Sequence, residues 1–148
     1  MKLVVNMVMG TMMGAFSEGM ALADQAGLAQ ADLLEVRFVT EPLESKCAVG
    51  ACAQRERNKR PTQVLSLGAI ANPMFALKGP SMTKREFPPA FPLKHQQKDL
   101  RLALELGHQV GLPLPVATAA DGVYRQAMAA GCADNDFAAV YTATLPPP

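Results

Sequence analysis

The chain has 148 residues, a length that suits one domain with a buried hydrophobic core. Hydrophobic residues make up 49% and charged residues 18%, which is ordinary for a globular protein, and the net charge of +1 gives no case for nucleic acid or an anionic membrane as partner. Three cysteines form no even-numbered disulfide framework, so we expect a reducing compartment. Nine methionines and no tryptophan predict a helical core packed with Met, Leu and Ala.

Residues 2 to 26 predict one long helix, because they contain no proline and are followed by Gly27, a common helix stop. Gly10, Gly14 and Gly19 each cost a helix up to about 1 kcal/mol relative to alanine, which suggests that another backbone, such as that of a further domain or a subunit partner, approaches it closely. A second helix is expected over residues 30 to 36.

Residues 1 to 23 also have an alternative interpretation as a targeting segment of a secreted or membrane-anchored protein. An apolar run is followed there by an A-x-A pattern at residues 21 to 23. Asn6 lies within the apolar run, and Ser17 and Glu18 interrupt it before the A-x-A pattern. Glu18 also falls within the only candidate membrane span, which would need about 20 mostly apolar residues. The long-helix interpretation is therefore the stronger one.

The block from 37 to 64 breaks the helical pattern. It has neither helical nor strand periodicity, and it contains six of the fourteen basic residues together with Cys47 and Cys52. We expect an irregular insert here, explained either by a retained intron in the gene or by a lineage-specific surface loop. The two cysteines are not spaced as C-x-x-C and no histidine accompanies them, so we expect no metal site. The basic run from 54 to 60 fits a solvated loop better than nuclear targeting.

The remaining helices carry local start and stop signals. Asparagine followed by proline marks an N-terminus, and glycine marks an end. Asn72-Pro73 is expected to open a short helix that runs through Phe75. Two longer helices are expected over Leu93–Gln109, closed by Gly111, and over Pro115–Ala130, closed by Gly131. A short last helix is expected to be capped by Asp134 and to run through Val140 and Tyr141. Few segments alternate as strands do, so the predicted fold class is all-α.

In the helix over Leu93–Gln109, the charged residues are concentrated near the N-terminal end. Lys94, Lys98 and Arg101 recur at helical spacing and share one stripe. Such a stripe either meets an anionic ligand or forms a solvated face.

Three ordered motifs carry a family resemblance: KLVVNMVMGTMMGAFSEGMALAD, GAIANPMFALKGPSM and FPLKHQQKDLRLALELG. Together they closely resemble the C-terminal domain of the β-hydroxyacid dehydrogenases, with the plant and algal glyoxylate/succinic semialdehyde reductases as the nearest branch. The resemblance covers residues 2 to 36 and 65 to about 143. It implies an all-α substrate and dimerisation domain, like that of 6-phosphogluconate and β-hydroxyacid dehydrogenases, formed by residues 1–36 and 65–148 around the insert at 37–64.

The resemblance also implies roles for individual residues. Lys2 and Asn6 match the family pattern K-x-x-x-N, and their spacing places them on one helix face. Lys2 is then the catalytic acid that stabilises charge developing on the carbonyl oxygen, and Asn6 orients the lysine or the substrate. Phe91 and Asp99 match positions for substrate handling and turnover, so the resemblance implies that Asp99 is catalytic together with Lys2 and that Phe91 and Asn6 bind substrate. Lys98 matches a lysine that reaches towards the cofactor and is expected to bind it.

Each of these residues except Lys98 also has an interpretation that involves neither substrate nor cofactor. Lys2 follows the initiator methionine and could be a frayed terminus, and Asn6 could be a satisfied core polar residue. Asp99 could be a carboxylate favoured near a helix start that pairs with His95, and Phe91 an ordinary core aromatic. His95 itself is not assigned an acid–base role, because the family does not use this position in that way.

The implied activity is reduction of glyoxylate or succinic semialdehyde to the hydroxyacid by NADPH, with NADH as the alternative. The partners expected are a small aldehyde-acid substrate and further copies of the chain, in the cytoplasm, a plastid or a mitochondrion. The 148 residues contain no G-x-G-x-x-G turn and no βαβ pattern, so most cofactor contacts are expected from an N-terminal dinucleotide-binding domain missing from this sequence. The alternative is a non-catalytic helical fragment that keeps only the oligomerisation surface.

The absence of that turn from the sequence generates a first prediction. The 148-residue chain expressed alone should show no measurable NADPH-dependent reduction of glyoxylate, because nothing in its sequence cradles a dinucleotide. NADPH oxidation followed by absorbance and NADPH binding followed by calorimetry both check this expectation. Tight NADPH binding by the isolated chain would show it to be wrong.

Overall fold

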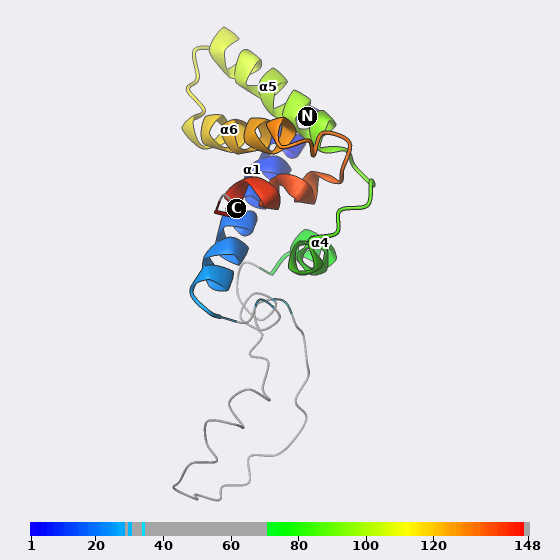
Figure 1. The fold of residues 1–148 in the computed structure, drawn as a ribbon. Coiled ribbons are helices and arrows are strands. Elements are labelled where there is room, and N and C mark those ends of the chain that lie inside the picture. Colours follow the sequence, from blue (N-terminus) through cyan, green and yellow to red (C-terminus); the bar gives the residue numbers. More distant parts are fainter. Residues whose placement is uncertain (29, 31–33, 35–70, 147–148) are drawn as a thin grey trace, which may run out of the picture.

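The computed structural model describes residues 1–28, 30, 34 and 71–146, and these residues form a bundle of helices (Figure 1). The elements are α1 (Lys2–Gln25), α4 (Pro73–Lys84), α5 (Leu93–Gln109), α6 (Pro115–Ala129) and the 3-10 helix η1 (Phe137–Thr144). Within this part of the chain there is no β-strand, only an isolated antiparallel bridge between Pro92 and Asp136. The all-α prediction is therefore confirmed.

Helix α1 is the axis of the bundle. It contacts α5, α6, η1 and α4, and Figure 1 shows η1 crossing it near the middle of the molecule. Its apolar positions recur at helical spacing and are buried, with Met13 at 0%, Phe16 at 7% and Met20 at 1% exposure. Phe16 stacks on Phe75 of α4, with ring centroids 4.4 Å apart.

The core is rich in methionine, leucine and alanine, as the composition predicts, but its largest members are aromatic. Tyr124 of α6 and Phe137 and Tyr141 of η1 are each at most 2% exposed. These three of the chain's eight aromatic residues lie on α6 and η1, both of which contact α1, and each buries more apolar area than an aliphatic side chain.

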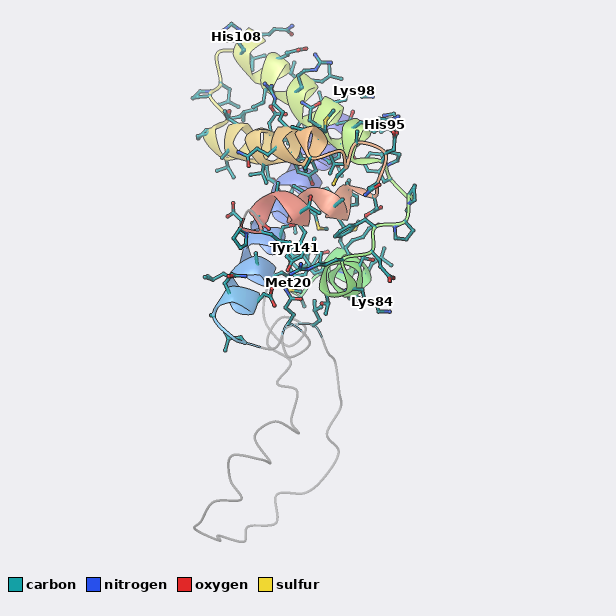
Figure 2. The ribbon with its side chains drawn as sticks, viewed as in Figure 1. Met20, Lys84, His95, Lys98, His108 and Tyr141 are labelled. Atoms are coloured by element: carbon teal, nitrogen blue, oxygen red, sulfur yellow. The ribbon has the colours of Figure 1, made fainter. Side chains whose placement is uncertain are left out.

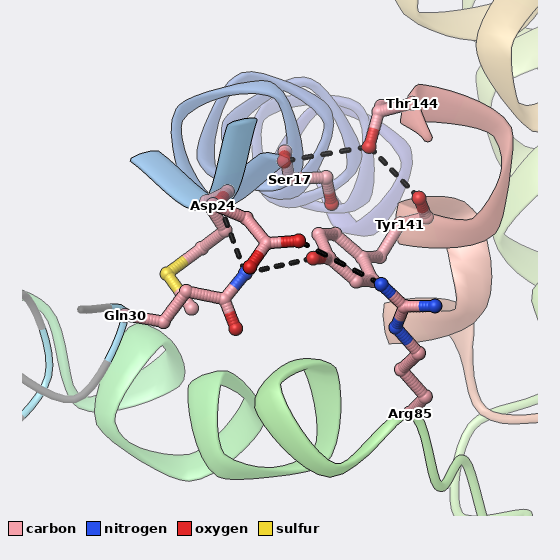
Figure 3. Close-up of polar contacts among 7 residues, drawn as sticks. Ser17, Asp24, Gln30, Arg85, Tyr141 and Thr144 are labelled. Atoms are coloured by element: carbon pink, nitrogen blue, oxygen red, sulfur yellow. Dashed lines mark hydrogen bonds and ion pairs between the residues drawn. The ribbon is translucent and has the colours of Figure 1, made fainter. Parts of the chain in front are cut away.

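Polar contacts tie the second half of α1 to its neighbours (Figure 3). The Gln30 side-chain amide donates to the carbonyl of Met20 at 3.0 Å and to the Tyr141 hydroxyl at 2.7 Å. Thr144 donates to the Ser17 carbonyl at 3.4 Å, and Arg85 at the end of α4 lies 3.6 Å from Asp24. These bonds fix η1 and α4 against α1, away from the N-terminal half of that helix.

Three of the expected helices agree with α1, α5 and α6 to within one residue at each end. Two expectations were wrong at their boundaries. The helix opened by Asn72 continues to Lys84 instead of stopping after Phe75; it runs past Pro80, and Met82 beyond the proline is fully buried in the core. The last helix is capped by Asp136, which accepts from the Ala138 amide at 3.0 Å; Asp134 is exposed and pairs with Lys94.

Several expectations fall outside the described residues. These are the block at 37–64 with Cys47 and Cys52, and the helix over 30–36 apart from Gln30 and Leu34. They stay predictions. Among the helices that the structure does describe, none is long and apolar enough to cross a membrane.

Gly10 of α1 marks a close approach, but of a side chain and not of another backbone. A Cβ built at Gly10 would overlap the Gln96 side-chain amide of α5 and lie 3.3 Å from Leu100 Cδ1. By contrast, a Cβ at Gly14 would lie 4.0 Å from that of Ala120, and one at Gly19 would meet nothing within 4 Å in the described part of the chain. Within the described residues, the nearest atoms at Gly10 and Gly14 belong to side chains, and the close approach of a further domain or of a subunit partner stays a prediction.

This difference predicts opposite effects for two glycine substitutions in one helix. Gly10→Ala should lower the free energy of unfolding by about 1–2 kcal/mol, because the buried Gln96 must shift. Gly19→Ala should raise it by up to about 1 kcal/mol through helix propensity alone. Urea unfolding followed by circular dichroism measures both, and equal stability of the two variants would contradict the proposed packing.

Candidate functional site

The start of α1 and the entry end of α5 meet through one short hydrogen bond. The Asn6 side-chain amide nitrogen donates to Asp99 Oδ2 at 2.6 Å. Asp99 is 9% exposed and Asn6 is partly buried, so the bond is largely removed from water. Two residues 93 positions apart, both expected at the site from the sequence, are thereby brought together.

Gln96 holds the same turn of α1 from the neighbouring position of α5. Its side-chain nitrogen donates to the Asn6 backbone carbonyl at 2.8 Å, and the side chain is fully buried. Gln96 Oε1 has no hydrogen-bond partner in the described structure. The sequence reasoning missed this residue. Its spacing did indicate a buried position, because Gln96 lies on the same face of the helix as the buried Leu93 and Leu100.

Lys98 stands beside Asp99 at the surface of the cluster. Its ammonium lies 3.6 Å from Asp99 Oδ1, and its side chain is 52% exposed. Asp99 therefore contacts Asn6 on one side and Lys98 on the other, and not His95 as the plainer interpretation proposed. Figure 2 shows His95 and Lys98 at the end of α5 that lies beside the start of α1.

Lys2 is exposed at the first position of α1, one turn before Asn6. The Asn6 amide nitrogen is occupied by Asp99, which directs the amide oxygen to other donors. Helical spacing puts Lys2 on the same face of α1 as Asn6. Lys2, Asn6, Asp99 and Lys98 thus lie at one end of the bundle.

Phe91 lies just before α5 and is partly buried. Its ring packs edge-on against Phe137, with centroids 5.8 Å apart, and lies tilted to the His95 ring at 6.4 Å. Its backbone is held by Asp136 and Phe137. Because His95 precedes Asp99 by one turn, Phe91 borders the same face of α5 at a greater distance from Asp99.

The stripe of cations on α5 is largely neutralised by acidic neighbours. Lys94 pairs with Asp134 and Arg101 with Glu105, each at 2.5 Å. The hydrogen bond and positive charge of Lys94 lower the pKa of the Asp134 carboxyl. The solvated-face interpretation therefore fits Lys94 and Arg101, whereas Lys98 faces the Asn6–Asp99 pair.

Chemically, the cluster offers an ammonium donor, an oriented amide and a carboxylate flanked by a second ammonium. This set suits a small anion that carries a carbonyl group. For a nicotinamide dinucleotide, the exposed Lys98 ammonium fits a contact at one edge, while the sequence offers no glycine-rich turn for the pyrophosphate.

Comparison with known proteins gives concordant matches. A family profile described as the NAD-binding region of NADP-dependent 3-hydroxyisobutyrate dehydrogenase matches residues 57–144. Glyoxylate/succinic semialdehyde reductase 1 and the chloroplastic reductase 2 of Arabidopsis thaliana are 47% and 44% identical, each over 143 residues and 97% of this chain. The chain spans only 40% and 32% of those relatives' lengths.

The fold is shared with a solved structure. A 3-hydroxyisobutyrate dehydrogenase from Salmonella typhimurium superposes with a TM-score of 0.69 at 21% sequence identity. The match covers 95% of this chain and 40% of that one.

The Asn6–Asp99 bond predicts energetic coupling between α1 and α5. Asn6→Ala, Asp99→Ala and the double variant should give a coupling energy of about 1–2 kcal/mol, because each single change leaves a largely buried polar group without its partner. Urea unfolding of the 148-residue chain measures it. As a control, the exposed Arg101–Glu105 pair should couple by less than about 0.5 kcal/mol. Coupling at the site no larger than in this control would argue against the bond.

Proposed function

This chain belongs to the family of NADP-dependent 3-hydroxyisobutyrate dehydrogenases, within the β-hydroxyacid dehydrogenases, and on that premise we propose that it forms the helical substrate-binding part of a reductase. The proposed reaction is reduction of glyoxylate or succinic semialdehyde to the corresponding hydroxyacid. The observation that carries the proposal is the cluster in which Asn6, bonded to Asp99, lies one turn from Lys2.

The cluster supports a division of roles. Lys2 donates a proton to the carbonyl oxygen and stabilises the negative charge that develops there. Asn6 turns its amide oxygen towards the Lys2 ammonium or the substrate, because its nitrogen is bonded to Asp99. Asp99 acts as a positioning residue, and Phe91 provides an apolar wall for the substrate. These roles follow the family pattern K-x-x-x-N and the residues that match it.

The cofactor would be NADPH, with NADH as the alternative, and when bound it supplies the hydride. In this proposal Lys98 holds the edge of the cofactor near the substrate, and the pyrophosphate is bound by a dinucleotide-binding domain outside these 148 residues. The half-exposed side chain of Lys98, with its ammonium beside Asp99, is compatible with that contact.

Self-association of the chain is part of the proposal. It is supported by large apolar side chains that remain exposed on one stripe of α1, namely Val4 at 49%, Val8 at 46% and Met12 at 36%. A cytoplasmic or organellar location is proposed with it, as expected for reductases of this branch.

A chimeric enzyme tests the proposed chemistry. Residues 1–148 would replace the matching segment of Arabidopsis reductase 1, with and without residues 37–64. The chimera should oxidise NADPH in the presence of glyoxylate, and Lys2→Ala should reduce kcat/KM by a hundredfold or more, about 3 kcal/mol, because a preorganised donor is lost. NADPH affinity should stay nearly unchanged.

The matched control is Lys94→Ala, which removes a lysine on α5 that pairs with exposed Asp134. This variant should keep full activity, and Asp99→Ala should lose less activity than Lys2→Ala. A Lys2→Ala chimera that keeps more than about a tenth of the activity would exclude Lys2 as the acid. A folded wild-type chimera with no activity in either form would favour the non-catalytic alternative.

A further inference from the structure

A largely buried ion pair contacts the backbone of Phe91. Lys78 of α4 places its ammonium 2.8 Å from Asp136 Oδ2, and the two side chains are 11% and 4% exposed. Burying two charges is costly, and a well-packed apolar pair of similar volume is often as stable or more stable. A buried pair that also orders specific groups has a use beyond stability, so its further contacts matter.

The Asp136 carboxylate binds two backbone amides in addition to Lys78. Oδ2 accepts from the Phe91 amide at 3.2 Å, and Oδ1 accepts from the Ala138 amide at 3.0 Å and caps η1. The backbone of Asp136 also donates to the Phe87 carbonyl at 3.2 Å. One carboxylate therefore joins α4, the segment before α5 and the start of η1.

Lys78 supports Phe91 by a second route, through Phe137. Its ammonium lies 5.2 Å from the centroid of the Phe137 ring, within the range of a cation–π contact. The Phe137 ring in turn packs edge-on against Phe91, and the Phe137 amide donates to the Phe91 carbonyl at 2.8 Å. Both the backbone and the ring of Phe91 are thus held by groups that contact Lys78.

We propose that the Lys78–Asp136 pair is a positioning element that fixes Phe91 at the edge of the site and thereby sets how tightly the aldehyde substrate fits. The effect on the fit of the aldehyde substrate rests on the proposed function. The positioning itself concerns only contacts within this chain. Lys78 and Asp136 touch neither substrate nor cofactor in this proposal, so their loss acts on substrate fit through Phe91.

The positioning is tested on the 148-residue chain by amide hydrogen exchange measured by NMR. Lys78→Met should accelerate exchange at Phe91 by tenfold or more relative to the Tyr124 amide in α6, which reports overall opening. Lys78→Arg should restore slow exchange, since arginine can also pair with Asp136. The matched control is Arg125→Met, which removes the cation 2.7 Å from another buried carboxylate, Asp121, and should leave Phe91 unchanged.

The outcomes separate positioning from plain stabilisation. If Lys78→Met accelerates Phe91 and Tyr124 by the same factor, or leaves Phe91 within twofold of the wild type, the positioning role is wrong. If Lys78→Met does not fold, Asp136→Asn is judged by the same comparison, because asparagine keeps an acceptor for the backbone amides but removes the charge.

The chimeric reductase tests the consequence for substrate. Lys78→Met should raise KM for the aldehyde at least fivefold with kcat and NADPH affinity within twofold of the wild type, and Lys78→Arg should reverse most of the change. An unchanged KM alongside accelerated Phe91 exchange would overturn the link to substrate fit. An inactive wild-type chimera would instead count against the proposed function, and the exchange experiment would still decide the positioning.

Discussion

The close crossing of α1 and α5 at Gly10 is the constraint on which the rest of the structure depends. Because residue 10 has no side chain, Gln96 can reach the Asn6 carbonyl from α5. The Tyr124 hydroxyl of α6 donates to the Gly10 carbonyl at 3.3 Å. Burial and the nearby charge of Asp136 raise the pKa of Tyr124, which keeps this donor protonated. Helices α5 and α6 therefore each bond to a backbone carbonyl in the same turn of α1, and these bonds hold Asn6 close to Asp99.

Three carboxylates of the bundle are buried. Asp99, Asp121 and Asp136 are each at most 9% exposed, and each is bonded to a group from another element. Asp121, for example, accepts from Gln97 of α5 at 3.0 Å and also pairs with Arg125 on its own helix. Such contacts gain little net stability after desolvation, but they require defined partners and so fix the register of the helices. The Asn6–Asp99 contact at the proposed site is one of these defined polar contacts.

The parts of this fold that could be predicted from sequence depend on neighbouring residues. The boundaries of α5 and α6 follow from proline at the start and glycine after the end, and those signals act within a few residues. The length of α4 and the capping residue of η1 could not be predicted from neighbouring residues. Met82 holds α4 together across Pro80 through the core, and Asp136 rather than Asp134 is the cap because its carboxylate also meets Lys78 from α4.

The residues of the candidate site can likewise be separated into those that the sequence indicated and those that depend on contacts between distant segments. Spacing alone placed Lys2 and Asn6 on one face, and the family resemblance selected Phe91, Lys98 and Asp99. Neither selected Gln96: its spacing indicates a buried position, but its partner is a backbone carbonyl, which no residue type in the sequence identifies. The buried amide–carboxylate pair is fixed by the helix crossing, whereas Lys2 is exposed at the helix end. In the described structure, then, the pair is the preorganised part, and Lys2 is the part whose geometry depends on what binds beside it.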